Sequence, residues 1–300
     1  MPKVSIVIPV YNGERFLREA LDSVFAQTFQ DFEVICVDDG STDGSLAIIR
    51  KYGEMIAVLR QRNAGGSAAR NAGVAQAAAP YVAFLDQDDR WYPHKLERQV
   101  SVMEMESDVV LVLCNSDRMD AEGRMLQLGA TLAERATLLD SPLGRLMEED
   151  QLLSSAILVR REAFERAGEY DSELRGFEDF DLCARLKRQG RFVFLEESGM
   201  CYRVHAGGFG QVTGGPIIVR SRERFLLKMK DLHVDDPAKK ELIRVMLAEC
   251  YSDWGMNEVR MGNFSEGRRM LRRSLVHNPL KFRTYSRFIR SFFPITGGLR

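Results

Sequence analysis

Along the first half of the chain, the spacing of hydrophobic positions alternates between two periods. Short, continuous apolar runs rich in β-branched residues, such as VSIVIPVY (4–11), are typical of strands buried on both faces. Between these runs, apolar residues recur every three to four positions, which predicts helices. The expected strands are 4–11, 32–39, 55–61, 81–86 and 109–115, and the expected helices are 14–26, 43–52, 65–78 and 92–105. Such alternation predicts an α/β fold with a mostly parallel sheet flanked by helices.

The second half of the chain is less regular. Residues 120–153 suggest a variable loop or a short hairpin with a helix. Farther on we expect a strand at 154–161, a helix at 178–190 and one or two short strands within 191–205. The stretch AGGFGQVTGG (206–215) has five glycines in ten residues, which predicts a mobile segment. Because the pattern is helical from 217 onward, we divide the chain into a main domain, 1–215, and a C-terminal helical extension, 216–300.

Within the extension, residues 248–281 have the pattern of a tetratricopeptide-like helical hairpin. Gly255, Gly262, Leu271 and Pro279 fall where such a hairpin places its small, apolar and terminating residues. Only one unit of this kind is visible, so we expect a helical cap rather than a stacked array.

Charge is distributed unevenly along the chain. The net charge is -1, yet nine basic and no acidic residues follow Glu266, which leaves a net of -10 (33 basic, 43 acidic) for the first 266 residues. A basic tail on an acidic body favours an anionic partner, either a membrane or a nucleic acid. The segment KFRTYSRFIRSFF (281–293) interleaves aromatic and basic residues, as interfacial membrane helices do. The same pattern also suits a terminal helix packed on the body.

Other features of the sequence concern the compartment. The five cysteines are scattered and form no CxxC pair, so we expect reduced core residues rather than disulfides or a zinc site. The start, MPKVSIVIPVYNG, runs straight into a strand, and no apolar run approaches the roughly 20 residues of a membrane span. We therefore expect no signal peptide and a cytoplasmic protein, peripheral on the inner face of the cell membrane if 281–293 binds lipid. The chain contains neither a P-loop nor a G-x-G-x-x-G motif. Of the two anionic partners that the basic tail could bind, we expect the membrane and not a nucleic acid.

Clusters of polar residues lie at or just after the C-terminal ends of the expected strands. They are PVYNGERF (9–16), VDDGSTDGS (37–45), QRNAGGSAARNAG (61–73) and the acids of YVAFLDQDDRW (81–91). In open α/β sheets this edge is where ligands bind. Each cluster has a simpler interpretation when taken alone: Ser41, Thr42 and Asp43 suit a turn and an N-cap, and DQDD suits solvated acids.

Taken together, in this order and spacing, these clusters closely resemble the inverting family 2 glycosyltransferases of the GT-A fold. Downstream, GFEDFDLCARL and YRVH extend the resemblance, which covers about residues 1–205. The resemblance implies transfer of a sugar from a nucleotide-diphosphate donor, a UDP-sugar, to a hydroxyl of a glycan or a lipid-linked saccharide.

The resemblance also implies roles for individual residues. Asp39 would accept a hydrogen bond from the base, at uracil N3–H. The implied nucleotide-binding residues are Pro9, Val10, Tyr11, Asp39, Asn63, Arg70 and Asp88. The implied metal ligands are Asp86, Asp88, Asp89 and His205. Carboxylates plus phosphate oxygens are ligands that suit Mn²⁺ or Mg²⁺.

The resemblance implies that the Glu-Asp pair of FEDFD (177–181) acts on the acceptor. Inversion needs a base that takes the proton of the acceptor hydroxyl, and in the resemblance this base is Asp179, oriented by Glu178. Acids in a first helical turn also complement the helix dipole without any function. Two other functions remain open: a nucleotidyltransferase acting on sugar phosphates, and an inactive nucleotide-sugar-binding module.

Overall fold

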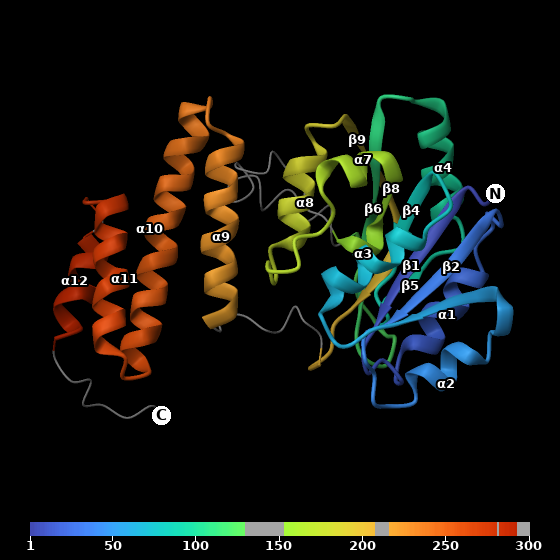
Figure 1. The fold of residues 1–300 in the computed structure, drawn as a ribbon, viewed down its shortest axis with the longest axis horizontal. Helices are drawn as coiled ribbons and strands as arrows, with labels where there is room; N and C mark the ends of the chain where they lie inside the picture. The colour runs from blue at the N-terminus through green and yellow to red at the C-terminus, as the bar shows by residue number, and fades with distance from the viewer. Residues whose placement is uncertain (130–152, 208–215, 281, 293–300) are drawn as a thin grey trace. The chain divides into compact units, whose positions relative to one another are not determined.

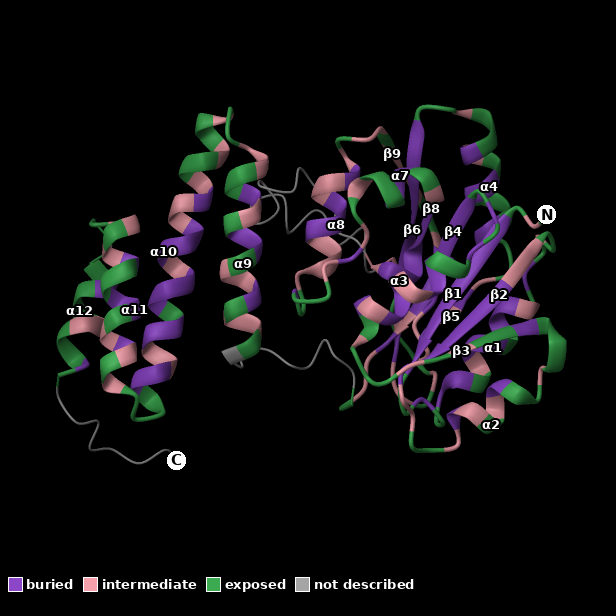
Figure 2. Cartoon of the chain, in the orientation of Figure 1, coloured by how far each residue is buried: buried purple, intermediate pink, exposed green. Residues whose placement is uncertain are grey.

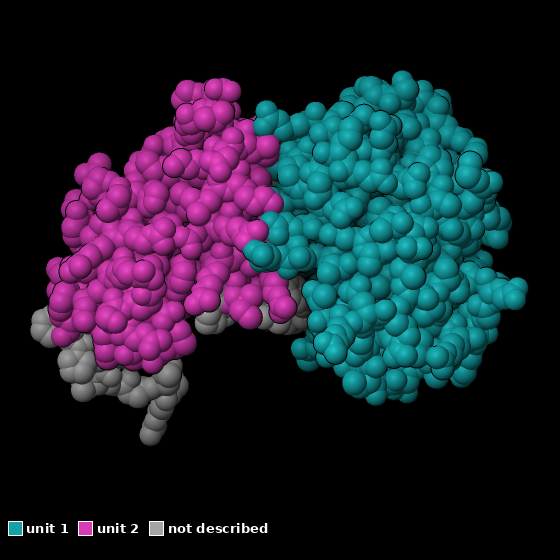
Figure 3. Space-filling model, in the orientation of Figure 1, with its two compact units in different colours: residues 1–173, 178–211 teal, residues 174–177, 212–300 magenta. Residues whose placement is uncertain are grey.

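The computed structural model describes residues 1–129, 153–207, 216–280 and 282–292. The chain divides into two compact units, shown in Figure 3. Unit 1 comprises Met1–Glu173 and Glu178–Gln211, and unit 2 comprises Leu174–Phe177 and Val212–Arg300.

Unit 1 is built on a nine-stranded sheet with the strand order β3-β2-β1-β4-β8-β6-β9-β5, with β7 paired to β6. The strands are β1 (Val4–Val10), β2 (Phe32–Asp38), β3 (Ile56–Arg60), β4 (Tyr81–Phe84), β5 (Arg90–Trp91), β6 (Val109–Met119), β7 (Met125–Gln127), β8 (Ile157–Arg160) and β9 (Arg191–Arg203). β1 is parallel to β2 and β4, β2 to β3, and β6 to β9, whereas β8 runs antiparallel to β4 and β6. The predicted α/β class is confirmed, and the sheet is mixed, because β5 and β7 also pair antiparallel, with β9 and β6.

Helices cover both faces of this sheet (Figures 1 and 2). They are α1 (Leu17–Phe25), α2 (Ser45–Arg50), α3 (Gly66–Gln76), α4 (Lys95–Met105), α7 (Arg161–Ala167) and α8 (Glu178–Leu186). The side chains of β1 alternate between the faces: Ile6 and Ile8 belong to the core formed with α1, α2 and α4. Val7 points the other way, toward Gly73 of α3. Every residue of β1 is buried, as its continuous apolar run predicted.

Some expected elements have different boundaries. Residues 154–156 form a 3-10 turn, Ser154–Ala156, and β8 starts only at Ile157, where pairing with β6 begins. One long strand with register shifts, β9, replaces the one or two short strands within 191–205. The helix expected from 92 starts at Lys95, because Arg90 and Trp91 pair with β9 as a strand. Within the predicted loop 120–153 and mobile segment 206–215, residues 130–152 and 208–215 lie outside the described residues.

Unit 2 contains α9 (Pro216–Leu232), α10 (Pro237–Arg260), α11 (Phe264–His277) and α12 (Phe282–Arg290). The side chain of Asp236 caps α10 by accepting from Lys239 N at 3.0 Å, and Pro237 occupies its first turn. Gly255 and Gly267 allow α10 and α11 to pack closely, because a Cβ at Gly255 would lie 2.8 Å from the Gly267 carbonyl oxygen. Among the helices that the structure describes, none is both long and apolar enough to cross a membrane.

Candidate active site

The polar clusters meet at the C-terminal edge of β1, β2 and β4. The loop after β1 is fixed to the loop after β4 by two hydrogen bonds: Tyr11 N donates to Gln87 Oε1 at 2.8 Å, and Gln87 Nε2 donates to Tyr11 O at 3.0 Å. The Tyr11 side chain stays exposed, whereas Pro9 and Val10 are buried. The β1 loop is also tied to the β2 loop, since Asn12 Oδ1 accepts from Thr42 N at 2.8 Å.

Asp39 organises the loop that leads into α3. Its buried carboxylate accepts from Ala64 N and Gly65 N, each at 2.8 Å, and from Gln61 Nε2 at 2.7 Å. Oδ1 receives two of these bonds and Oδ2 receives one, so Oδ2 retains capacity for another donor. The neighbouring Asn63 is exposed.

Asp38, in contrast, has a structural role. It accepts from Ser41 N at 2.9 Å and pairs with Arg60 Nε at 3.0 Å. The turn interpretation of the following residues agrees with this geometry, because Asp43 Oδ1 accepts from Ser45 N at 3.0 Å. The N-cap of α2 is Gly44, which provides no side-chain cap.

Arg70 projects from α3 to the acids at the end of β4. Its guanidinium pairs with Asp86 and lies over the ring of Tyr170, 5.4 Å from the centroid. Arg70 is buried, and its Nε has no hydrogen-bond partner within the described residues. In this structure Arg70 therefore neutralises Asp86, which leaves Asp88 and Asp89 as the less compensated acids of DQDD.

Asp88 is held by a residue that follows the C-terminal end of β9. Asp88 Oδ2 lies 2.8 Å from His205 Nε2, and the imidazole packs against Phe16, with ring centroids 4.8 Å apart. The main-chain oxygen of Asp88 accepts from Arg203 Nε at 2.8 Å. The predicted metal ligand His205 is thus brought to the acidic cluster, with Nε2 directed at a carboxylate.

Asp89 is buried between a hydroxyl and a main-chain amide. It accepts from Ser155 Oγ at 2.6 Å and from Arg203 N at 3.0 Å. Burial and the charges of Asp88 and Asp86 raise the pKa of Asp89 well above its ordinary value. Burial, followed by the charge of Asp86, also raises the pKa of Asp88.

These carboxylates fit a divalent cation whose remaining ligands come from elsewhere. Two acids whose negative charge is disfavoured by burial and by each other would be stabilised by a bound cation. Among the described residues, no three His, Cys, Asp or Glu side chains form a complete metal site. Mg²⁺ commonly binds through one or two carboxylates plus substrate phosphates, so a pair such as Asp88 and Asp89 is sufficient for this mode.

The predicted base Asp179 lies at the start of α8 and contacts the same 3-10 turn as Asp89. Ser154 Oγ donates to Asp179 Oδ1 at 2.7 Å and lies 3.0 Å from the hydroxyl of Tyr170. Burial, opposed by the charge of Arg70, raises the pKa of Asp179 to about 7. A carboxylate that titrates near neutral pH is well suited to general base catalysis.

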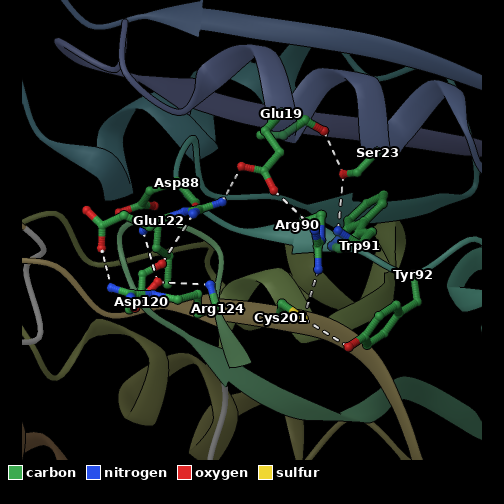
Figure 4. Close-up of polar contacts among 12 residues, drawn as sticks. Glu19, Ser23, Asp88, Arg90, Trp91, Tyr92, Asp120, Glu122, Arg124 and Cys201 are labelled. Atoms are coloured by element: carbon green, nitrogen blue, oxygen red, sulfur yellow. Dashed lines mark hydrogen bonds and ion pairs between the residues drawn. The ribbon is translucent and has the colours of Figure 1, made fainter. Parts of the chain in front are cut away.

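A second layer of polar contacts fixes the strands behind the acids. Glu19 of α1 accepts from Arg90 Nη1 at 3.2 Å and from Arg203 Nη2 at 2.5 Å, and Figure 4 shows Glu19 beside Arg90. Trp91 is buried, and its Nε1 donates to Ser155 O at 2.8 Å. Trp91 therefore packs in the core and supports the Ser154–Ala156 turn.

The contribution of Ser154 and Ser155 was not predicted from the sequence. The two adjacent hydroxyls reach Asp179 and Asp89 respectively, and Ser155 Oγ also accepts from Asp86 N at 3.0 Å. The only signal in the sequence is a pair of polar residues directly before the apolar run AILV, and the pattern predicts that pair as the start of a strand.

Residues 5–166, more than half of the chain, match the sequence profile described as Glycosyl transferase family 2. The chain therefore belongs to glycosyl transferase family 2. It is 32% identical over 207 residues to an uncharacterized glycosyltransferase of Rickettsia prowazekii (68% of this chain, 65% of the relative). It is 34% identical over 212 residues to one of Nostoc sp. (68% of this chain, 65% of the relative). The matches span slightly less than two thirds of these relatives.

The fold is similar to that of the crystal structure of S. aureus TarS 1-349 in complex with UDP-GlcNAc. The TM-score is 0.69 with 20% sequence identity, over 97% of this chain and 89% of that chain. At this identity the likeness concerns the fold alone. Family membership favours a glycosyltransferase over the nucleotidyltransferase alternative.

Proposed function

We propose that this chain is an inverting glycosyltransferase that transfers a sugar from a UDP-sugar to a hydroxyl of a glycan or a lipid-linked saccharide. The single observation that carries the proposal is the Ser154–Ala156 turn, which joins Asp179, a carboxylate with a pKa of about 7, to the acids that end β4. A one-step displacement requires a base held close to the groups that bind the diphosphate, and this turn contacts both.

The donor assignment rests on the β1, β2 and α3 loops. Asp39 Oδ2 retains a lone pair for uracil N3–H. The other proposed nucleotide-binding residues come from the end of β1, the loops after β1 and β3, and α3: Pro9, Val10, Tyr11, Asn63 and Arg70. Similar folds support a uridine nucleotide, since TarS 1-349 was crystallised with UDP-GlcNAc and with UDP.

Asp88 and Asp89 would hold Mn²⁺ or Mg²⁺, and His205 would position Asp88. Asp86, which the resemblance implies as a further ligand, pairs with Arg70 instead. When bound, the cation offsets the negative charge of the diphosphate leaving group. His205 keeps the Asp88 carboxylate oriented through its 2.8 Å contact, and Ser155 does the same for Asp89.

In the transfer step, Asp179 removes the proton from the acceptor hydroxyl as its oxygen bonds to the anomeric carbon. The bond from that carbon to the diphosphate oxygen breaks, and UDP leaves with the electron pair. Glu178 would orient the acceptor, because its Oε2 is buried and has no hydrogen-bond partner within the described residues. A buried oxygen of this kind gains from a hydroxyl donor.

The experiment is UDP release measured with a panel of UDP-sugars, with and without Mn²⁺, together with UDP binding by calorimetry. Asp179→Asn should bind UDP like the wild type and lose transfer by about 10²–10⁴-fold. Asp31→Asn, an exposed carboxylate at the opposite end of β2, is the matched control and should retain both. Transfer that survives in Asp179→Asn would remove Asp179 as the base, and UDP binding without release for any sugar would favour the inactive binding module.

A further inference from the structure

Helix α12 packs on its neighbours through small polar residues. Thr284 is its buried position, and Thr284 Oγ1 lies 3.3 Å from both Ser252 Oγ of α10 and Ser274 Oγ of α11. Arg287 adds a hydrogen bond to Ser252 Oγ at 2.7 Å. A terminal helix that serves as a cap normally buries its apolar side, and α12 does the opposite.

The large apolar side chains of α12 instead form an exposed strip along its outer side. We define the aromatic stripe as the following residues, given with their exposed fractions: Phe282 (83%), Tyr285 (42%), Ile289 (59%) and Phe292 (55%). Their spacing of three, four and three residues places them on one side of a helix. Three large side chains on one face of α12, continued by Phe292 just after the helix ends at Arg290, indicate an interaction surface.

Arginines border the aromatic stripe on both sides. Arg283 and Arg290 of α12 are exposed and form no ion pair within the described residues. From α11, Arg268 lies over the ring of Phe292 at 4.9 Å, and Arg272 lies over the ring of Phe288 at 5.6 Å. No acidic residue follows Glu266, and the ion pair of Arg287 with Asp253 of α10 offsets only one of the positive charges of α12.

We infer that the aromatic stripe and its arginines dock unit 2 on an anionic lipid surface. A helix with an apolar face beside a basic face lies in the membrane interface, where its rings enter the headgroup region and its arginines meet lipid phosphates. A symmetric contact with a second copy of the chain is a poorer alternative, because it would bring the unpaired Arg283 and Arg290 of the two copies together. Nucleic acid is also a poorer occupant, because the centre of the surface is apolar and only its borders are basic.

The test is co-sedimentation of the full chain with vesicles of phosphatidylcholine, with and without about one third phosphatidylglycerol, at low and high salt. Wild type should bind the anionic vesicles, and less so as salt rises. Phe282→Ser with Ile289→Ser should abolish binding, because it removes apolar area that would be buried in the membrane interface. Arg283→Gln with Arg290→Gln should weaken binding by roughly fivefold per arginine. No donor or acceptor is needed, so the result is independent of the proposed function.

Matched controls on unit 1 are Met55→Ser, which removes another exposed apolar side chain, and Arg50→Gln, which removes another exposed arginine. Both should bind vesicles like the wild type, and all variants should show unchanged thermal melts because the substituted positions are exposed. The inference is overturned if the wild type ignores anionic vesicles or if the stripe variants bind as well as the controls. It is equally overturned if light scattering shows a dimer that the stripe variants abolish, or if the wild type binds a single-stranded oligonucleotide but no vesicles.

Discussion

Ser154 donates a hydrogen bond to Asp179 at 2.7 Å, although 25 positions separate the two residues in the chain. The next residue, Ser155, makes the corresponding bond to Asp89 at 2.6 Å. One 3-10 turn therefore sets the position of the proposed base relative to the acids that would hold the donor. Since reacting groups must be closely aligned, this turn would determine the catalytic geometry of the proposed reaction.

The first prediction concerns the pH dependence of transfer. Burial raises the pKa of Asp179 to about 7, so the carboxylate is protonated below that pH and acts as a base only above it. We expect kcat/KM to rise about tenfold per pH unit below pH 7 and to level off above it. Initial rates between pH 5.5 and 9 measure this profile. A flat profile across pH 7 would contradict the assignment.

The second prediction follows from the Ser154 hydroxyl, whose hydrogen bond lowers the pKa of Asp179. Ser154→Ala removes this bond, so the pKa of Asp179 and the rise in kcat/KM should both move to higher pH. Ser154→Thr retains a hydroxyl and should restore the profile. A purely structural role would reduce the rate at every pH without moving the profile, and that result would count against an electrostatic role.

The sequence predicts the strands that carry the site better than the contacts that tune it. β1, β2 and β4 are fully buried over most of their length, so they remain visible as continuous apolar runs, and the acids that end them stand out. Ser154 was missed because its turn depends on the pairing of β8 with β4 and β6, which no local pattern encodes. The Arg70–Asp86 pair was missed for a similar reason, since its members come from different elements.

The third prediction concerns Asp89 in the protein without ligands. Burial and the neighbouring carboxylates disfavour its charged form, which makes the ionised side chain a destabilising feature. Asp89→Asn keeps an acceptor for Arg203 N and should leave the melting temperature unchanged or raise it. The additional stabilisation by UDP with Mn²⁺ should be lost, which differential scanning fluorimetry can measure with and without a chelator.

A second buried aspartate provides the control for this experiment. Asp38→Asn places an amide beside Arg60 and weakens the bond from Ser41 N, so it should destabilise the protein by about 1–3 kcal/mol. If Asp89→Asn destabilises the unliganded protein as much as Asp38→Asn does, Asp89 is a structural residue and not a poised ligand.

The last prediction concerns how α3 is seated on the sheet. A Cβ at Gly73 would lie 2.3 Å from Val7 Cγ1, and Val7 is held within a central, fully buried strand. Replacing glycine by alanine in a helix normally stabilises it by about 1 kcal/mol. Gly73→Ala should instead destabilise the protein by about 1–3 kcal/mol in urea unfolding, since the core must expand. Combining it with Val7→Ala removes the clash, so the double variant should lose less than the sum of the two single losses. Additive losses would show that α3 can move away from the sheet, so that Gly73 and Val7 do not constrain each other.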